Sequence, residues 1–410
     1  MKHIYKSGLK LISEYKFKEN TSAFRLYVNI GSIYENPKEK GIAHLVEHLI
    51  FKSTKTKTTL EIAKELEMYG ATINAYTNYD ITCFHFTVLN DNFLNCIKIY
   101  SDMIFNKDIK QDEFEREKQV VIQELCMYQD LYDSVNEENY YKEYYGWDPI
   151  IGYRNILESI TLEDVMNFIH KYYIPQNMLI STVSNYPSFI IKRIIRKYFA
   201  DKNNDGVNTS MIKIKPKKLI KFDNKAKKVK SKSAQAQVFI AYDVNRYDPL
   251  SATYITYISN LCNLGLSSVF FEEVREKEGL CYGIHAETDY FFNKEIFNNY
   301  PSTFNVLIKT EVPNVKKVIN KVDYVMNHLP ELIDKQDIVK LKNFYKQHDI
   351  TVEERAGYNA RHFDDKKFIS IDKTFKICKK MTLKKAKSII IKCFTTKPKY
   401  KAMLLGQFKN

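Results

Sequence analysis

Two histidines and a glutamate lie within five consecutive residues, His44-Leu45-Val46-Glu47-His48. Apolar residues at helical spacing from Gly41 to Phe51 predict a helix, on which both imidazoles share one face about one turn apart. This is the geometry that two zinc ligands need. Glu47 shares that face and can reach a metal-bound water without ligating, in the reverse of the commoner His-Glu-x-x-His order. The alternative is a helix with two surface histidines and a capping acid.

A catalytic zinc site needs a third protein ligand, and a second predicted helix offers two candidates. The pattern from Asp112 to Asp130 is that of a long charged helix. Its apolar side carries Phe114, Val121 and Leu125. Glu117 and Glu124 stand two turns apart along one face, so one could ligate while the other orients a histidine from behind. An ordinary solvated helix face is the alternative for both glutamates.

These two helices must be positioned by a first half in which strands and helices mix. Alternating apolar residues and turn residues predict strands over Leu9–Tyr15, Ala23–Ile33, Ala71–Thr77, Ile81–Leu89 and Met178–Val183. Further helices are predicted over Leu60–Tyr69, after the capping pair Thr161 and Asp164, and from Ser188.

The second half repeats the order strand, helix, helix, strand. The predicted elements are Ala236–Asp243, Leu250–Asn263, Leu266–Glu276 and Tyr282–Tyr290. A chain of 410 residues is too long for one ordinary core. We therefore expect an α+β fold of two similar domains, each a mainly antiparallel sheet packed with helices. The expected bounds are 1–205 for the N-terminal domain, 206–235 for a lysine-rich linker region, and 236–410 for the C-terminal domain.

The net charge of +14 admits nucleic acid, an anionic membrane or acidic substrates as partners. The densest basic stretch, Lys213 to Lys232, lacks the interleaved aromatic residues that bind single-stranded nucleic acid. No helix-turn-helix, zinc-finger or RNA-binding signature is present. We expect no nucleic-acid partner, and a solvated linker is the interpretation of the basic stretch.

The remaining composition points to a cytoplasmic protein. The seven cysteines are scattered without a Cys-x-x-Cys pair, as expected of reduced thiols. No run of 18 apolar residues occurs, so no membrane partner is expected. The first residues lack the apolar stretch of a secretory signal.

The stretch from Gly41 to Thr54, GIAHLVEHLIFKST, resembles the active-site segment of the pitrilysin, or insulinase, family of zinc metallopeptidases (inverzincins). In that family the third ligand is a glutamate far beyond the second histidine, and Glu124 stands at the matching place. Ser53 and Ser184 stand where the family usually has glycine, so turn geometry can differ there. The resemblance continues through Gly70–Thr77, Pro149–Gly152, Tyr173–Met178, Gly265–Ser268 and Arg275–Tyr282.

The resemblance implies a zinc-dependent endopeptidase. His44, His48 and Glu124 would hold Zn²⁺, and Glu47 would be the general base. Glu117 would support the metal site from behind. The first domain would then be the catalytic, zinc-binding one.

The resemblance also implies how a substrate is held. Asn74 and Ala75 lie on the strand beside which the family's peptide substrates add as an extra edge strand. Arg275 and Tyr282 match the family's arginine–tyrosine pair, which contacts the substrate and the oxygen that becomes negative. Peptides that are short or unfolded fit such a site, and leader or precursor processing is one such use.

Assembly is a further implication. The family encloses its site in four similar domains, and this chain supplies two. It therefore resembles the short subclass that includes mitochondrial processing peptidase subunits and bacterial processing-protease-like proteins. We expect a homodimer, or a heterodimer with a related subunit. The alternative function is a catalytically silent scaffold or partner subunit, against which the complete metal motif argues.

Overall fold

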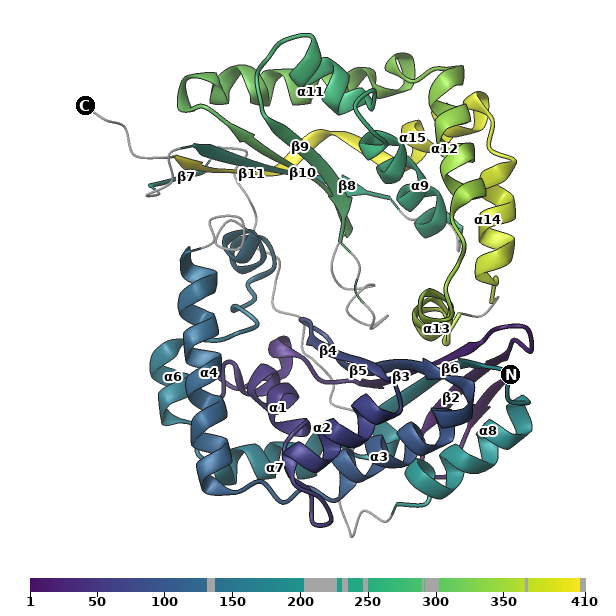
Figure 1. Cartoon of the computed structure of the whole chain (residues 1–410). Helices are drawn as coiled ribbons and strands as arrows, with labels where there is room; N and C mark the ends of the chain where they lie inside the picture. Colours follow the sequence, from purple (N-terminus) through teal and green to yellow (C-terminus); the bar gives the residue numbers. More distant parts are fainter. Residues whose placement is uncertain are drawn as a thin grey trace. The chain divides into compact units, whose positions relative to one another are not determined.

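The computed structural model describes residues 1–130, 137–202, 227–230, 235–245, 250–289, 291, 302–365 and 368–405. The chain forms two compact units (Figure 1). The first comprises Met1–Met127, Trp147–Lys215 and Ile350–Phe368, and the second comprises Tyr128–Gly146, Pro216–Asp349 and Ile369–Asn410. Each unit thus takes in a short segment from the other half of the sequence. No helix among the described residues is long and apolar enough to cross a membrane.

The first unit is built on a six-stranded sheet of order β1-β2-β6-β3-β5-β4. β2 and β6 run parallel, and every other neighbouring pair is antiparallel. β4 therefore forms one edge of this sheet. The strands are β1 (Lys2–Ile4), β2 (Lys10–Tyr15), β3 (Thr21–Val28), β4 (Thr72–Thr77), β5 (Thr82–Leu89) and β6 (Met178–Ser184).

Helices cover one face of this sheet, where alternate strand residues such as Phe24 and Phe86 meet buried helix residues (Figure 1). α13 packs on the opposite face, where Val352 and Ala356 contact Ala23 and Val183. The helices are α1 (Ile42–Ile50), α2 (Thr59–Met68), α3 (Phe93–Phe105), α4 (Gln111–Asp130), α6 (Arg154–Ser159), α7 (Leu162–Tyr172), α8 (Ser188–Ile195) and α13 (Val352–Arg361), with short turns η1 (Ser32–Tyr34), η2 (Asn90–Asn92), η4 (Pro175–Asn177) and η5 (Arg196–Ala200).

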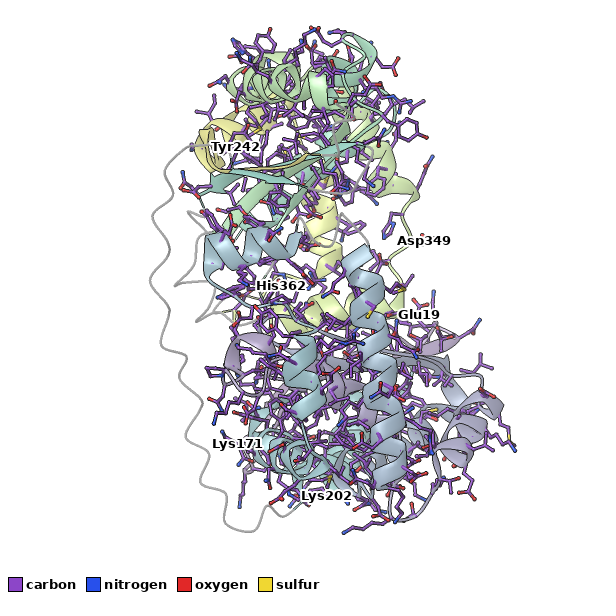
Figure 2. All side chains as sticks on the ribbon, turned by 90° about the vertical axis from the view of Figure 1, so that its left-hand side faces the viewer. Glu19, Lys171, Lys202, Tyr242, Asp349 and His362 are labelled. Carbon is purple, nitrogen blue, oxygen red and sulfur yellow. The ribbon has the colours of Figure 1, made fainter. Side chains whose placement is uncertain are left out.

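The second unit has a five-stranded sheet of order β7-β11-β8-β10-β9, in which only β7 and β11 are parallel. Helices again pack on one face, and Tyr242 of β8, labelled in Figure 2, is buried there and donates to Asp323 at 2.9 Å. On the other face Tyr140 stacks on Phe239, with ring centroids 4.4 Å apart. The elements are β7 (Lys227–Lys230), β8 (Ala236–Val244), β9 (Gly283–Thr288), β10 (Ser302–Thr310), β11 (Phe394–Leu405), α9 (Ser251–Asn263), α11 (Val315–Leu332), α12 (Lys335–Gln347), α14 (Ile371–Lys379), α15 (Leu383–Cys393), η3 (Tyr141–Tyr145), η6 (Phe271–Glu276) and η7 (Val312–Asn314).

The two sheets have the same plan. β2-β6-β3-β5-β4 matches β7-β11-β8-β10-β9 strand for strand, and the first pair of each is parallel. Two helices, α1 and α2, separate β3 from β4, and α9 and η6 separate β8 from β9. The predicted α+β fold of two similar domains is confirmed.

Three local expectations differ from the structure. The strand predicted to reach Ile33 ends at Val28, and η1 follows it. The helix predicted from Leu266 begins at Val269, after Gly265 in the left-handed region with φ 74°. Within the expected linker 206–235, Lys227–Lys230 forms β7 and pairs with β11, while the rest lies almost wholly outside the described residues.

Both ends of α1 are held by buried side chains. The carboxylate of Glu35 accepts from the amides of Gly41 (3.0 Å) and Ala43 (2.8 Å) at the N-terminus. The amine of Lys107 donates to the carbonyls of Ile50 (2.7 Å) and Lys52 (2.6 Å) at the C-terminus. Burial raises the pKa of Glu35 to about 8 and lowers that of Lys107 to about 7. Hydrogen bonds to groups that a helix leaves unpaired therefore fix both ends of α1.

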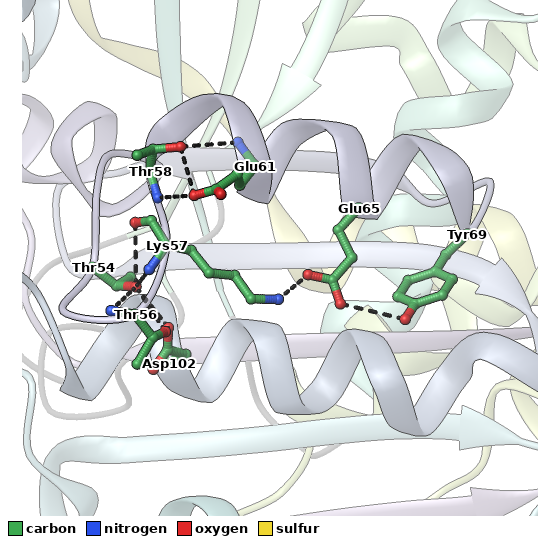
Figure 3. Close-up of polar contacts among 8 residues, drawn as sticks. All are labelled: Thr54, Thr56, Lys57, Thr58, Glu61, Glu65, Tyr69 and Asp102. Atoms are coloured by element: carbon green, nitrogen blue, oxygen red, sulfur yellow. Dashed lines mark hydrogen bonds and ion pairs between the residues drawn. The ribbon is translucent and has the colours of Figure 1, made fainter.

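The chain after α1 is fixed to α3 by hydroxyl groups (Figure 3). Thr54 and Thr56 each donate to Asp102 at 2.7 Å. Thr58 then begins α2 with a capping box, in which its hydroxyl accepts from the amide of Glu61 and the Glu61 carboxylate accepts from the Thr58 amide. α1, α2 and α3 are thereby tied together by local polar contacts as well as by the core.

Replacing Glu35 with alanine should destabilise the first unit, because two buried amides lose their acceptor. The expected loss is about 1–3 kcal/mol in the free energy of unfolding. Glu35→Gln keeps one acceptor oxygen and should lose less. Urea denaturation followed by circular dichroism measures both, with Glu67→Ala on the exposed side of α2 as control. Equal midpoints for Glu35→Ala and the control would contradict this role of Glu35.

Candidate metal centre

His44 and His48 of α1 and Glu124 of α4 come together between the two helices. Nε2 of His44 lies 3.2 Å from Oε2 of Glu124, and Nε2 of His48 lies 3.3 Å from the same oxygen. The three ligand atoms all lie within 4.8 Å of one another. The positions of the histidines follow from the amphipathic pattern, because Ile42 and Val46 are fully buried on the opposite side of α1.

This arrangement fits a zinc ion. Zinc bonds of about 2.0–2.1 Å in a tetrahedron put neighbouring ligand atoms about 3.3–3.4 Å apart. The two imidazole-to-carboxylate separations, 3.2 and 3.3 Å, are close to that edge length. Two imidazoles and one carboxylate are also a donor set of catalytic zinc sites, which keep the fourth position open.

The other ring nitrogens meet carboxylates too. Nδ1 of His48 lies 2.9 Å from Oε1 of Glu117, and Nδ1 of His44 lies 3.4 Å from Oε2 of Glu47. Lys52 holds the second oxygen of Glu117 at 2.6 Å. Nδ1 of each ring thus has a carboxylate partner, and Nε2 is the atom of each ring that faces Glu124 and would ligate a metal.

The charges of this site balance only with two further positive charges. Glu47, Glu117 and Glu124 bring three carboxylates and Lys52 brings one ammonium group, and these side chains are between 12% and 23% exposed. With neutral imidazoles the sum is −2. One divalent cation would neutralise it.

The pKa shifts follow the same balance. Burial alone would lower the pKa of His48, but hydrogen bonds with Glu117 and Glu124 outweigh it and raise the pKa to about 9. Burial also lowers the pKa of His44, and hydrogen bonds with Glu124 and Glu47 raise it overall. Hydrogen bonds from both histidines lower the pKa of Glu124 well below its usual value. Protons on the imidazoles and a metal ion therefore compete for the same place.

One carboxylate oxygen of Glu47 accepts a hydrogen bond from another element of the first unit. Its Oε2 accepts a hydrogen bond of 2.7 Å from the hydroxyl of Thr77, the last residue of β4. No partner for Oε1 occurs among the described residues. One carboxylate oxygen is anchored and the other is available to a water, which is what a general base needs.

Asn74 and Ala75 lie on β4, at the open edge of the sheet. β4 pairs with β5, with Asn74 opposite His85 and Ala75 opposite Phe84, and its other side carries no strand among the described residues. The amide of Ala75 donates to the side-chain oxygen of Asn74 at 2.8 Å. An exposed strand edge is where an extended peptide can add.

Arg275 and Tyr282 contact each other in the second unit. The Arg275 guanidinium lies 5.2 Å from the Tyr282 ring centroid and 4.4 Å from the Phe271 ring centroid. Tyr282 is 77% exposed, a high value for a large aromatic side chain. Tyr282 is therefore accessible to a ligand on this surface, and Arg275 beside it is 34% exposed and lies 3.9 Å from Glu276.

Comparison with protein families covers both units. Residues 10–150 match the model for insulinase (peptidase family M16), and residues 159–345 match the model for the peptidase M16 inactive domain. The chain belongs to the insulinase, or pitrilysin, family. Within this family member, the residues of the metal centre lie in the first match, and Arg275 and Tyr282 lie in the second.

Curated relatives carry the name of a protease. An "uncharacterized zinc protease" of Rickettsia bellii is 27% identical over 364 residues, which cover 87% of this family member and 84% of the relative. A protein of the same description from Bacillus subtilis is 27% identical over 284 residues, or 68% of each chain.

Solved structures share the whole fold. A protease from Helicobacter pylori superposes with a TM-score of 0.83 at 21% identity and covers 98% of both chains. A Pseudomonas fluorescens structure described as a peptidase M16 inactive domain superposes with a TM-score of 0.81 at 16% identity, covering 100% of this chain and 98% of that one. At these identities the likeness concerns the fold alone.

Lys52, Thr77 and Ser53 contact glutamates of the site or of α4, although no sequence motif predicts these contacts. Ser53 stands where glycine was expected, and its hydroxyl donates to Glu113 of α4 at 2.7 Å. Thr77 shares the core-facing side of β4 with Ala75, and a buried hydroxyl on such a side requires a partner. A threonine on the core-facing side of a predicted strand therefore indicates a hydrogen bond to another element, and this pattern could have identified Thr77.

Glu124→Ala should lose bound zinc, because two imidazoles alone are fewer than the three protein ligands of a catalytic site. Zinc per chain, measured by mass spectrometry after dialysis, should fall from about one toward zero. Glu115→Ala on the solvent side of α4 is the matched control and should keep the metal. Wild-type zinc content in Glu124→Ala would contradict the assignment and make Glu117 the candidate ligand.

Proposed function

We propose that the protein is a zinc-dependent endopeptidase. The observation that carries this proposal is the His44–His48–Glu124 group, whose donor atoms have zinc spacing and whose surroundings need two positive charges. His44, His48 and Glu124 would hold the ion. Membership in a peptidase family and relatives named zinc proteases support the proposal.

The reaction would be peptide hydrolysis with Glu47 as the general base. Zinc, when bound, lowers the pKa of a water molecule and polarises the scissile carbonyl group. The available oxygen of Glu47 would accept a proton from the attacking water and later donate it to the leaving amine. Glu117, fixed by Lys52, holds the Nδ1 proton of His48 and so keeps the ring in its ligating orientation.

The substrate would bind as an additional strand along β4. Backbone groups at Asn74 and Ala75 would pair with an extended peptide, so recognition would depend on the main chain more than on side chains. Folded proteins cannot offer such a strand. Short or unfolded peptides are therefore the proposed substrate class, and leader or precursor processing is one use of this selectivity.

We further propose a dimer in which Arg275 and Tyr282 complete the site of a partner chain, which would be a second copy or a related subunit. Their hydrogen-bond donors would stabilise the negative oxygen of the tetrahedral intermediate. The exposure of Tyr282 supports this role, because its ring and hydroxyl lie at the surface of the second unit. A closed two-fold pairing would contain two equivalent sites.

Glu47→Gln should keep zinc and reduce kcat for an unstructured peptide by at least about 10²- to 10⁴-fold, because the amide cannot accept the proton. Cleavage is followed by mass spectrometry with a peptide library, and Glu67→Gln on α2 serves as control. Near wild-type turnover in zinc-loaded Glu47→Gln would show that Glu47 is not the base. A zinc-loaded wild-type protein that cleaves no library peptide would favour the scaffold alternative.

His48→Ala and Tyr282→Phe test the dimer together. Each variant should be nearly inactive alone, since one lacks the metal centre and the other lacks the tyrosine hydroxyl. After subunit exchange, a mixed dimer contains one site with an intact zinc helix and an intact tyrosine, so activity should return. Sedimentation verifies that dimers form. Mixed dimers whose activity stays at the sum of the separate variants would place the site within one chain or with another partner.

A further inference from the structure

Thr77 connects the strand edge on which a peptide would dock to the carboxylate that would act as base. Its hydroxyl donates to Oε2 of Glu47 at 2.7 Å, and the same oxygen lies 3.4 Å from Nδ1 of His44. Thr77 is 8% exposed, so water does not compete freely for this hydrogen bond. The side chain of Glu47 is therefore fixed from β4 as well as from its own helix.

The backbone at Thr77 is itself well fixed. Thr77 pairs with Thr82 of β5, and Thr82 pairs in turn with Val28 of β3. The hydroxyl of Thr82 donates to the carbonyl of Ile30 at 2.8 Å. Thr77 is thus fixed through β5 and β3. It lies on the same open-edge strand as Asn74 and Ala75, which are three and two residues before it.

The spacing of residues along β4 determines how far a docked peptide lies from the Glu47 carboxylate. A strand rises about 3.3 Å per residue, so Ala75 and Thr77 are about 7 Å apart. A peptide paired with β4 at Ala75 therefore has its register fixed relative to Thr77, and through the hydroxyl relative to Glu47. Rotation of Glu47 about its side-chain bonds would otherwise leave this relation open.

We propose that Thr77 is a positioning residue, which orients the Glu47 carboxylate relative to a peptide docked on β4. The hydrogen bond holds Oε2 and leaves Oε1 directed to the water. The proposal rests on the proposed peptidase function and adds a residue that none of the motif positions supplies. Thr77 touches neither substrate nor metal in this role and acts only through Glu47.

Thr77→Val removes the hydroxyl at nearly constant volume, and Thr77→Ser keeps it. With a peptide substrate, kcat of Thr77→Val should fall about 10- to 100-fold, the effect of losing one hydrogen bond to a charged group. KM and zinc content should stay within about twofold of wild type. Thr77→Ser should restore kcat to within about threefold. Thr87→Val on β5 is the matched control and should match wild type, because no hydrogen-bond partner for the Thr87 hydroxyl occurs among the described residues.

A second measurement does not depend on turnover. In the Glu47→Gln background, peptide affinity is measured by fluorescence anisotropy with and without Thr77→Val. Equal affinities within about twofold are expected, because the substitution leaves the docking edge intact. A loss of affinity or of zinc would show that Thr77 supports the strand or the metal site instead, which overturns the proposal.

The outcomes separate this inference from the function on which it rests. If Glu47→Gln is inactive and Thr77→Val has wild-type kcat, the positioning role is wrong and the peptidase proposal stands. If zinc-loaded Glu47→Gln cleaves peptides at the wild-type rate, Glu47 is not the general base, and the role of Thr77, which acts through Glu47, is wrong with it. If Thr77→Ser is as impaired as Thr77→Val, the hydroxyl is not the group responsible, and the inference is again wrong.

Discussion

The charge balance between α1 and α4 is the constraint on which the rest of the first unit depends. Partly buried carboxylates are costly unless paired, and Glu47, Glu117 and Glu124 exceed the single ammonium group of Lys52 by two charges. Raised pKa values of His44 and His48 show one way to supply the missing charge, and a divalent ion is the other. The side chains of such a site repel one another when neither protons nor a metal ion are bound, so the surrounding structure must hold α1 and α4 in place.

That scaffold acts mainly on α1. Beyond the bonds from Glu35 and Lys107, the helix begins at Gly41, whose φ of 98° lies in the left-handed region. A Cβ at Gly41 would come 2.5 Å from the carbonyl oxygen of Ile151, so a side chain fits neither the conformation nor the space. The contact explains why the Pro149–Gly152 segment packs against the start of α1, although it lies far away in the sequence.

Local spacing was enough to predict the histidine pair on one helix face, the two-turn separation of Glu117 and Glu124, and the recurrence of elements that makes two similar domains. It could not decide which glutamate faces both Nε2 atoms, because that depends on how α1 and α4 pack. Lys52 and Thr77 were missed for the same reason, since their partners lie on other elements. The inclusion of 350–368 in the first unit is a long-range contact that no periodicity encodes.

The two copies of the duplicated plan differ in the helix that follows their matching strands β3 and β8. α9 occupies the place of α1, between the strands that match β3 and β4, yet Ser251–Asn263 contains no histidine, aspartate or glutamate. The second unit therefore shares the sheet plan but lacks histidine and carboxylate side chains on this helix, which fits the description of its family model as an inactive domain. Tyr282 directly precedes β9, the strand that matches β4, and Arg275 lies in η6 before it. The strand that would dock a peptide in the first unit thus corresponds to a strand preceded by the exposed Tyr282 in the second. Under the proposed function, the two copies of the plan would contribute different parts of one site.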